Sequence, residues 1–114
     1  MTLTFQTMPL GTNNLYINGT RGRFLSPKAR ENKQQIAWEA RSQYRGKPLE
    51  GPLAVEIWLV WGDRRKRDVD NIKALLDACT GVLWADDSQI ADLHIIKHYD
   101  KENPHVEMRV WPLN

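Results

Sequence analysis

Alternating apolar and polar residues predict four strands along the chain. Thr2 to Met8 alternates and is rich in the residue types that favour strands. Leu53 to Trp61 is the strongest candidate, and both of its faces are mostly apolar, which favours a central strand buried on two sides. Gln89 to Tyr99 and His105 to Trp111 follow, and the turn residues between them, Asp100 to Pro104, predict a hairpin.

Two segments have the apolar spacing of helices. Ser26 and Pro27 suit the N-cap and the first helical position, so the first helix is predicted from there to about Tyr44. The second runs from about Asp70 to Thr80, where Gly81 ends it. The residues expected to face the core are Ala29, Ile36, Ala37 and Ala40 in the first helix and Ile72, Leu75, Leu76 and Cys79 in the second.

The segments between these elements are rich in turn residues or in charge. Pro9 to Phe24 is predicted to be an irregular loop, and Gly62 to Arg67 a charged loop. The resulting β-α-β-α-β-β order predicts an α/β (α+β) fold: a small single domain, residues 1–114, with a mixed sheet of about four strands and two main helices. The apolar runs are too short to span a membrane, and the single cysteine favours a reducing cytoplasm.

Charge is divided unevenly between the two halves of the chain. Residues 1–50 contain eight Lys and Arg against three Asp and Glu, and residues 51–114 contain eight against eleven. A basic half beside an acidic half fits a phosphate-binding surface next to a metal site. It fits equally well two solvated faces of an ordinary small domain, so the charge pattern alone does not decide the function.

Four aspartates within twenty residues give this pattern a specific chemistry. Asp68 and Asp70 lie in RRKRDVDN, Asp86 and Asp87 lie in WADDSQ, and a basic run, Arg64 to Arg67, precedes the first pair. Carboxylates gathered beside cations suit Mg²⁺, a hard ion that two or three carboxylates can hold while it meets a phosphate. A metal-dependent nuclease is therefore the leading hypothesis.

Each of these residues also has an ordinary structural interpretation. Asp70 can be a helix N-cap, and Asp86-Asp87 can be an exposed acidic turn. Helical spacing puts Lys73 and Asp77 on the face of Asp70. There Lys73 either neutralises charge on a phosphate or pairs with Asp77 at the surface.

Several other polar or reactive residues are expected to be structural. Cys79 lies in the apolar stripe of the second helix, which favours a buried thiol over a nucleophile. Core packing is also the better interpretation of Trp84, although an indole beside an acidic pair could stack on a base. His94 and His98 share a strand face without an evident third ligand, so no zinc site is predicted.

The stretch Lys66 to Lys97 resembles the RusA family of Holliday junction resolvases. That family has D-x-D-N, a helix with Lys and Asp, then G-x-x-x-x-D-D-x-Q and a strand ending in Lys. The matching residues are Asp68-Val69-Asp70-Asn71, Lys73, Asp77, Gly81, Asp86-Asp87, Gln89 and Lys97. The segments MPLGTNNLY and RFLSPKARENK are similar to the family's Pro-Asn loop and basic helix start. Relative to the family pattern one residue is missing near Ile72, so Lys73 comes one position early.

The resemblance implies a homodimeric nuclease of DNA recombination and repair that makes paired nicks in four-way or branched DNA with Mg²⁺ or Mn²⁺. Family members are often encoded by phages or prophages. The implied catalytic residues are Asp68, Asp70, Asp87 and Lys73, and the implied metal ligands are Asp68, Asp70 and Asp87 with Asp86. We expect the DNA backbone to be bound by Arg64, Arg65, Lys66, Arg67, Arg21, Arg23, Lys28 and Arg30.

Two other classes of function stay open at this point. A non-catalytic protein that binds branched DNA would show the same cations, and in a purely structural protein the aspartates would all be caps or turns. DNA binding alone gains nothing from three carboxylates near a phosphate backbone, which favours the nuclease.

Overall fold

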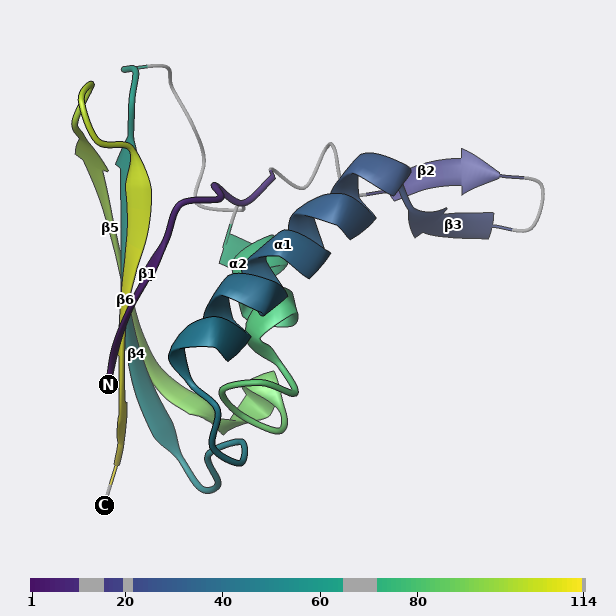
Figure 1. Cartoon of the computed structure of the whole chain (residues 1–114). Helices are drawn as coiled ribbons and strands as arrows, with labels where there is room; N and C mark the ends of the chain where they lie inside the picture. Colours follow the sequence, from purple (N-terminus) through teal and green to yellow (C-terminus); the bar gives the residue numbers. More distant parts are fainter. Residues whose placement is uncertain (11–15, 20–21, 65–71, 114) are drawn as a thin grey trace.

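The computed structural model describes residues 1–10, 16–19, 22–64 and 72–113. Four strands form one mixed sheet in the order β1 (Thr2–Phe5), β6 (His105–Pro112), β4 (Leu53–Trp61) and β5 (Ile90–Tyr99). Strands β4 and β5 are parallel, and the other neighbours are antiparallel. Helices α1 (Pro27–Gln43) and α2 (Ile72–Cys79) cover the same face of this sheet (Figure 1). The predicted α+β fold is therefore confirmed.

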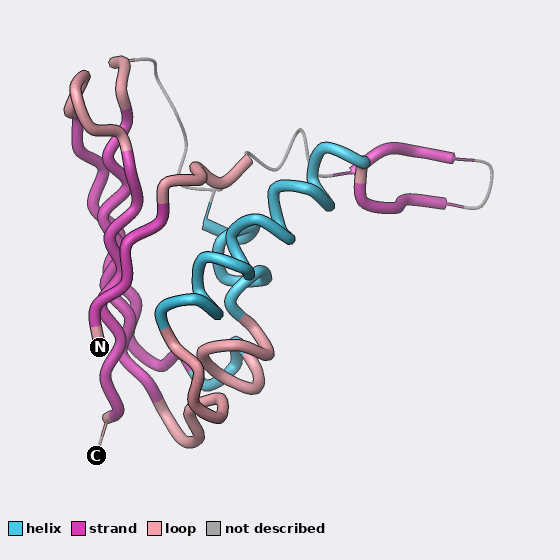
Figure 2. Tube along the Cα trace, in the orientation of Figure 1, coloured by secondary structure: helices cyan, strands magenta, loops and turns pink. Residues whose placement is uncertain are grey.

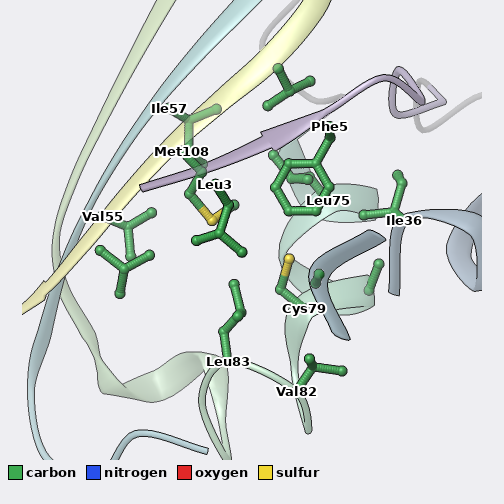
Figure 3. Packing of buried hydrophobic residues seen from close by; sticks show 14 of the residues in the cluster. Leu3, Phe5, Ile36, Val55, Ile57, Leu75, Cys79, Val82, Leu83 and Met108 are labelled. Atoms are coloured by element: carbon green, nitrogen blue, oxygen red, sulfur yellow. The ribbon is translucent and has the colours of Figure 1, made fainter. Parts of the chain in front are cut away.

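The core lies between the sheet and the two helices. Strand β4 is central, as predicted, and its Val55 and Ile57 are fully buried. They meet Leu3 of β1 and Met108 of β6, while the helices contribute side chains such as Leu75 (Figure 3). The long apolar run of β4 is thus explained by neighbours on both sides and helices above it.

Helix α1 begins where the sequence predicts. The Ser26 hydroxyl accepts a hydrogen bond from the backbone N–H of Ala29 at 3.0 Å, and Pro27 occupies the first turn. Ile36 and Ala40 are buried against the core, whereas Ala37, also expected there, is only half-buried. The helix thus presents a narrower apolar face than predicted.

Helix α2 is described from Ile72 onward, so its predicted start at Asp70 lies outside the described residues. It is apolar on the predicted side, with Cys79 fully buried. Gly81 has φ of +90°, a left-handed conformation that favours glycine and ends the helix as expected. No helix in the described part of the chain is long and apolar enough to cross a membrane.

Three features differ from prediction. The hairpin expected between β5 and β6 does not form, because β4 lies between these two strands in the sheet and pairs with both. The first strand ends at Phe5 rather than Met8 because the N–H groups of Gln6 and Thr7 donate to the Glu39 carboxylate, at 2.7 and 3.3 Å, instead of to a neighbouring strand. The prediction of an irregular loop over Pro9 to Phe24 was wrong. It contains an antiparallel hairpin of β2 (Tyr16–Gly19) and β3 (Gly22–Leu25), which projects beyond the start of α1 (Figure 2).

Candidate functional site

The acidic pair Asp86-Asp87 follows a tightly anchored loop. Trp84 is fully buried, and its Nε1 donates to the Thr80 hydroxyl at 3.0 Å. That hydroxyl donates in turn to the carbonyl oxygen of Leu76 at 2.9 Å. Trp84 is therefore a core residue, as expected, and cannot stack on a base without unfolding the loop. It fixes the backbone two residues before the acidic pair.

Asp86 caps a single turn of 3-10 helix, Asp87–Gln89. Its Oδ1 accepts a hydrogen bond from the backbone N–H of Ser88 at 3.0 Å. This hydrogen bond, helped by those with the side chains of Ser88 and Asp87, holds the pKa of the Asp86 carboxyl below its ordinary value. The turn also displaces the start of β5 from the predicted Gln89 to Ile90. Asp86 is thus a fixed surface anion with one oxygen engaged in the cap.

Gln89 completes the cap and ties it to a distant segment. Its Oε1 accepts from the N–H groups of Ala85 and Asp86, both at 3.0 Å. Its Nε2 donates to the carbonyl oxygens of Leu49 at 2.8 Å and Gly51 at 3.0 Å, which immediately precede β4. This role was not predicted from the sequence, although an Asp followed three residues later by Gln is the signature of a capping box.

Lys73 and the acidic pair lie at opposite ends of α2. Lys73 lies in the first turn of α2, and Asp86-Asp87 lies beyond its other end, where β4 and β5 begin (Figure 1). Eight helical residues measure about 12 Å. Asp77 lies between them on α2 and is half-buried. Asp68 and Asp70, the other two predicted ligands, lie outside the described residues.

The predicted DNA-binding cations that can be located also lie away from the acidic pair. Lys28 and Arg30 are exposed in the first turn of α1, next to the hairpin (Figure 1). The Arg64 guanidinium lies 4.3 Å from the ring centroid of Tyr99, beyond the carboxyl ends of β4 and β5. Arg21, Arg65, Lys66 and Arg67, and the side chain of Arg23, lie outside the described residues.

The acidic pair offers ligands that suit a hard cation, but two carboxylates alone do not form a complete metal site. Asp86 and Asp87 are both exposed and offer oxygen ligands, the type that Mg²⁺ and Mn²⁺ prefer. Within the described ranges, no group of three or more His, Cys, Asp or Glu side chains is placed to hold a metal ion. Cys79 adds no ligand, because burial raises the pKa of its thiol to about 12.

The small mixed sheet and the exposed carboxylate pair are compatible with a metal-dependent enzyme, and comparison with known families gives the class. A family model described as "Endodeoxyribonuclease RusA" matches residues 6–111. The chain therefore belongs to the RusA endodeoxyribonuclease family, as the resemblance of its motifs indicated.

Curated relatives agree with this assignment. The chain is 31% identical to a crossover junction endodeoxyribonuclease RusA of Aquifex aeolicus, over 96% of this chain and 90% of the relative. It is 33% identical to the proteins of the same description from Escherichia coli strain K12 and from Enterobacteria phage 82, over 75% of this chain and 74% of each relative.

Proposed function

We propose that this chain is a structure-selective endodeoxyribonuclease that hydrolyses phosphodiesters in crossover junctions, and so acts in DNA recombination and repair. The observation that carries the proposal is the match of nearly the whole chain, residues 6–111, to the RusA endodeoxyribonuclease family. The anchored acidic pair supports a catalytic protein over one that only binds branched DNA, because carboxylates held at the surface repel a phosphate backbone unless a cation lies between them. The whole chain acts as one domain in this proposal, in a reducing cytoplasm.

The metal ligands are the aspartates in both acidic segments. Asp87 is exposed in the first turn of the 3-10 helix, and with Asp68 and Asp70 it would hold Mg²⁺ or Mn²⁺. Asp86 contributes less to the ion, since one of its oxygens is engaged by Ser88. When bound, the ion supplies a water of lowered pKa and stabilises charge on the attacked phosphate.

Lys73 is proposed to add positive charge on the phosphate side of the site. It is exposed in the first turn of α2, directly after the segment that contains Asp68 and Asp70. An ammonium there stabilises the extra negative charge that develops on the phosphate as its bond to the leaving oxygen breaks.

The test of the function is cleavage of synthetic four-way junctions in Mg²⁺ by the wild type and by Asp87→Asn. The variant keeps the shape and the fold but removes a charged ligand, so we expect the cleavage rate to fall by about a hundredfold or more. Asp86→Asn is the matched control: asparagine is an equally good N-cap, and its rate should fall much less. Wild type that binds junctions and leaves them intact in both Mg²⁺ and Mn²⁺ would instead support the branched-DNA-binding alternative.

We also propose that the enzyme is a homodimer in which the acidic pair of one subunit completes the site of the other. The separation of Lys73 from Asp86-Asp87 along α2 supports this arrangement. Mixing Asp70→Asn and Asp87→Asn subunits tests it. If each site combines residues of both subunits, one site of the mixed dimer keeps its native Asp70 and Asp87, so the mixture would nick one strand. If each site lies within one subunit, both sites of the mixed dimer carry a substitution, and the mixture would be inactive.

A further inference from the structure

An open groove of about 460 Å³ lies at the end of α1 nearest the acidic loop. Its lining includes Trp38 and Arg41 of α1, Tyr44 and Arg45 just beyond the helix, and Gly81 and Val82 of the loop that follows α2. Both contributing segments lie at the end of the molecule where β4 and β5 begin (Figure 2). None of the predicted DNA-binding residues lines this groove in the described part of the chain.

The groove combines an exposed aromatic face with two cations. Trp38 has 65% of its surface exposed, the largest exposure among the exposed large apolar residues that the structure describes. Arg41 lies one helical turn after Trp38, and Arg45 follows the extended C-cap residue Tyr44, and all three line the groove. Across the described ranges, no carboxylate lies within ion-pair distance of Arg41 or Arg45. The two charges are thus available to an anionic ligand.

The neighbouring acidic residue of α1 is directed elsewhere. The Glu39 carboxylate accepts hydrogen bonds from the N–H groups of Gln6 and Thr7, which follow β1. The carbonyl groups at the end of α1 would by themselves disfavour an anion. Arg41 in the last turn and Arg45 beyond it more than offset that partial charge, and the backbone N–H of Tyr44 already engages the carbonyl oxygen of Ala40.

The turn after α1, which forms one wall of the groove, is held in place by specific contacts. The Tyr44 hydroxyl donates a hydrogen bond to the carbonyl oxygen of Lys47 and so closes the turn after α1. Gly46 lies beneath the Tyr44 ring, where a Cβ atom would come within 2.8 Å of the hydroxyl oxygen and 2.9 Å of Cζ. Only glycine fits under the ring without displacing it. This packing holds Arg45 next to the opening.

Hydrogen bonds link the lining of the groove to the loop that carries the acidic pair. The N–H of Gly81, which lines it, donates to the carbonyl oxygen of Trp84 at 2.7 Å. Leu49, two residues after the Tyr44–Lys47 turn, donates its N–H to the carbonyl oxygen of Leu83 at 2.8 Å and accepts from Gln89. One wall of the groove and the acidic pair therefore belong to the same hydrogen-bonded loop.

We propose that this groove binds the DNA strand on one side of the cleaved phosphate, with Trp38 stacking on a base that is unstacked at the branch point. Arg41 and Arg45 bind its phosphates. The inference rests on the proposed nuclease function and names a substrate contact for it. A stacking indole favours bases that have left the duplex, because a paired base offers its face only at a helix end. Trp38 would thus help to select branched over linear DNA.

The chemistry of the groove favours DNA over a second copy of the chain. A homodimer contact centred on Trp38 would bring the arginines of both subunits together unless acidic residues of the partner met them. The groove lining contains two arginines and no acidic residue among the described positions. A polyanion satisfies both cations at once, and phosphate contacts of this type give binding a steep dependence on salt.

The experiment measures binding of a fluorescent four-way junction and a linear duplex, with Ca²⁺ replacing Mg²⁺ so that cleavage is suppressed. Trp38→Ala should weaken junction binding by about tenfold or more and duplex binding much less, while Trp38→Phe should recover most of the loss. Arg41→Ala and Arg45→Ala should each reduce the slope of log K against log salt by about 0.7 to 0.9. Lys101→Ala, which removes an exposed cation from the β5–β6 turn, is the matched control and should change neither.

The outcomes separate this inference from the proposed function. Wild type that cuts junctions, with Trp38→Ala and Arg41→Ala binding them as well as Lys101→Ala does, would overturn the groove and leave the nuclease intact. Trp38→Ala that becomes monomeric by sedimentation while the wild type is dimeric would assign the groove to self-association and also overturn the inference. Wild type that neither binds nor cuts junctions would remove the function and the inference together.

Discussion

The side-chain amide of Gln89 donates a hydrogen bond to the carbonyl oxygen of Leu49, forty residues earlier in the chain, at 2.8 Å. The same side chain accepts hydrogen bonds from two backbone N–H groups at the start of the acidic loop. One glutamine therefore connects the turn that carries Asp87 to the segment that leads into the central strand. The position of the acidic pair depends on a residue that needs no contact with metal or DNA.

Gln89→Ala should destabilise the fold and the site together. The loss leaves two carbonyl oxygens and two N–H groups without their partner, and should lower the free energy of unfolding by about 1–3 kcal/mol in urea titration. The cleavage rate should fall even where the protein is fully folded. Gln89→Glu keeps an oxygen that can accept from Ala85 and Asp86 but loses the amide that donates to Leu49 and Gly51. If the two hydrogen bonds of the cap stabilise the fold by themselves, the stability of Gln89→Glu should lie between those of the wild type and Gln89→Ala. Gln34→Ala, an exposed change on α1, is the control and should alter neither quantity.

The hydrogen bond between Trp84 and Thr80 should be measurable by a double-mutant cycle. Thr80→Val keeps the shape but leaves Trp84 Nε1 buried without its acceptor, which should cost about 1–3 kcal/mol of stability. In a Trp84→Phe background the same substitution should cost much less, because no N–H remains to be satisfied. Equal costs in the two backgrounds would show that this hydrogen bond does not hold the loop.

Stability should fall at alkaline pH because of Cys79. Burial raises the pKa of this thiol from 9.0 to about 12, so the folded state holds its proton more tightly than the unfolded state. The contribution is fully present below pH 9 and is lost as pH rises from 9 toward 12. In that interval the wild type should lose about 1.4 kcal/mol per pH unit more than Cys79→Ala. Chemical denaturation at pH 8, 9.5 and 10.5 measures the difference, and parallel pH profiles of the two proteins would contradict it.

The strands of the main sheet could be predicted because most have long, distinct patterns, but their order, with β4 between β5 and β6, could not. Strand β4 is nine residues of nearly continuous apolar sequence, and its observed bounds are those predicted. The hairpin was missed because β2 and β3 have four residues each and lie among glycines and asparagines that are typical of loops. The early end of β1 was unpredictable from local pattern, since it depends on Glu39, more than thirty residues away.

The candidate site was predictable in its residue types and only partly in its arrangement. The spacing of D-x-D-N and D-D-x-Q indicated the family, which the comparisons confirm. The separation of Lys73 from Asp87 along α2 does not follow from that spacing, because helical periodicity specifies a face and not the path of the next loop. Trp38 and Arg41 share one side of α1 at a spacing that was visible in the sequence, and Arg45 joins them just beyond the helix. The position of Gly81 and Val82, which form the other wall of the groove, could not be predicted because it depends on tertiary packing.

Parallel pairing of β4 with β5 has a consequence for the order of folding. The crossover through α2 and the acidic loop is short, so paired residues of β4 and β5 are about 40 positions apart, whereas those of β1 and β6 are more than a hundred apart. Pairings between distant segments form more slowly, because a longer stretch of chain must be ordered first. We therefore expect β4, α2 and β5, with the hydrogen bond from Gln89 to Leu49, to assemble before β1 joins the sheet. The turn that carries the acidic pair would then be positioned by the part of the chain that folds first.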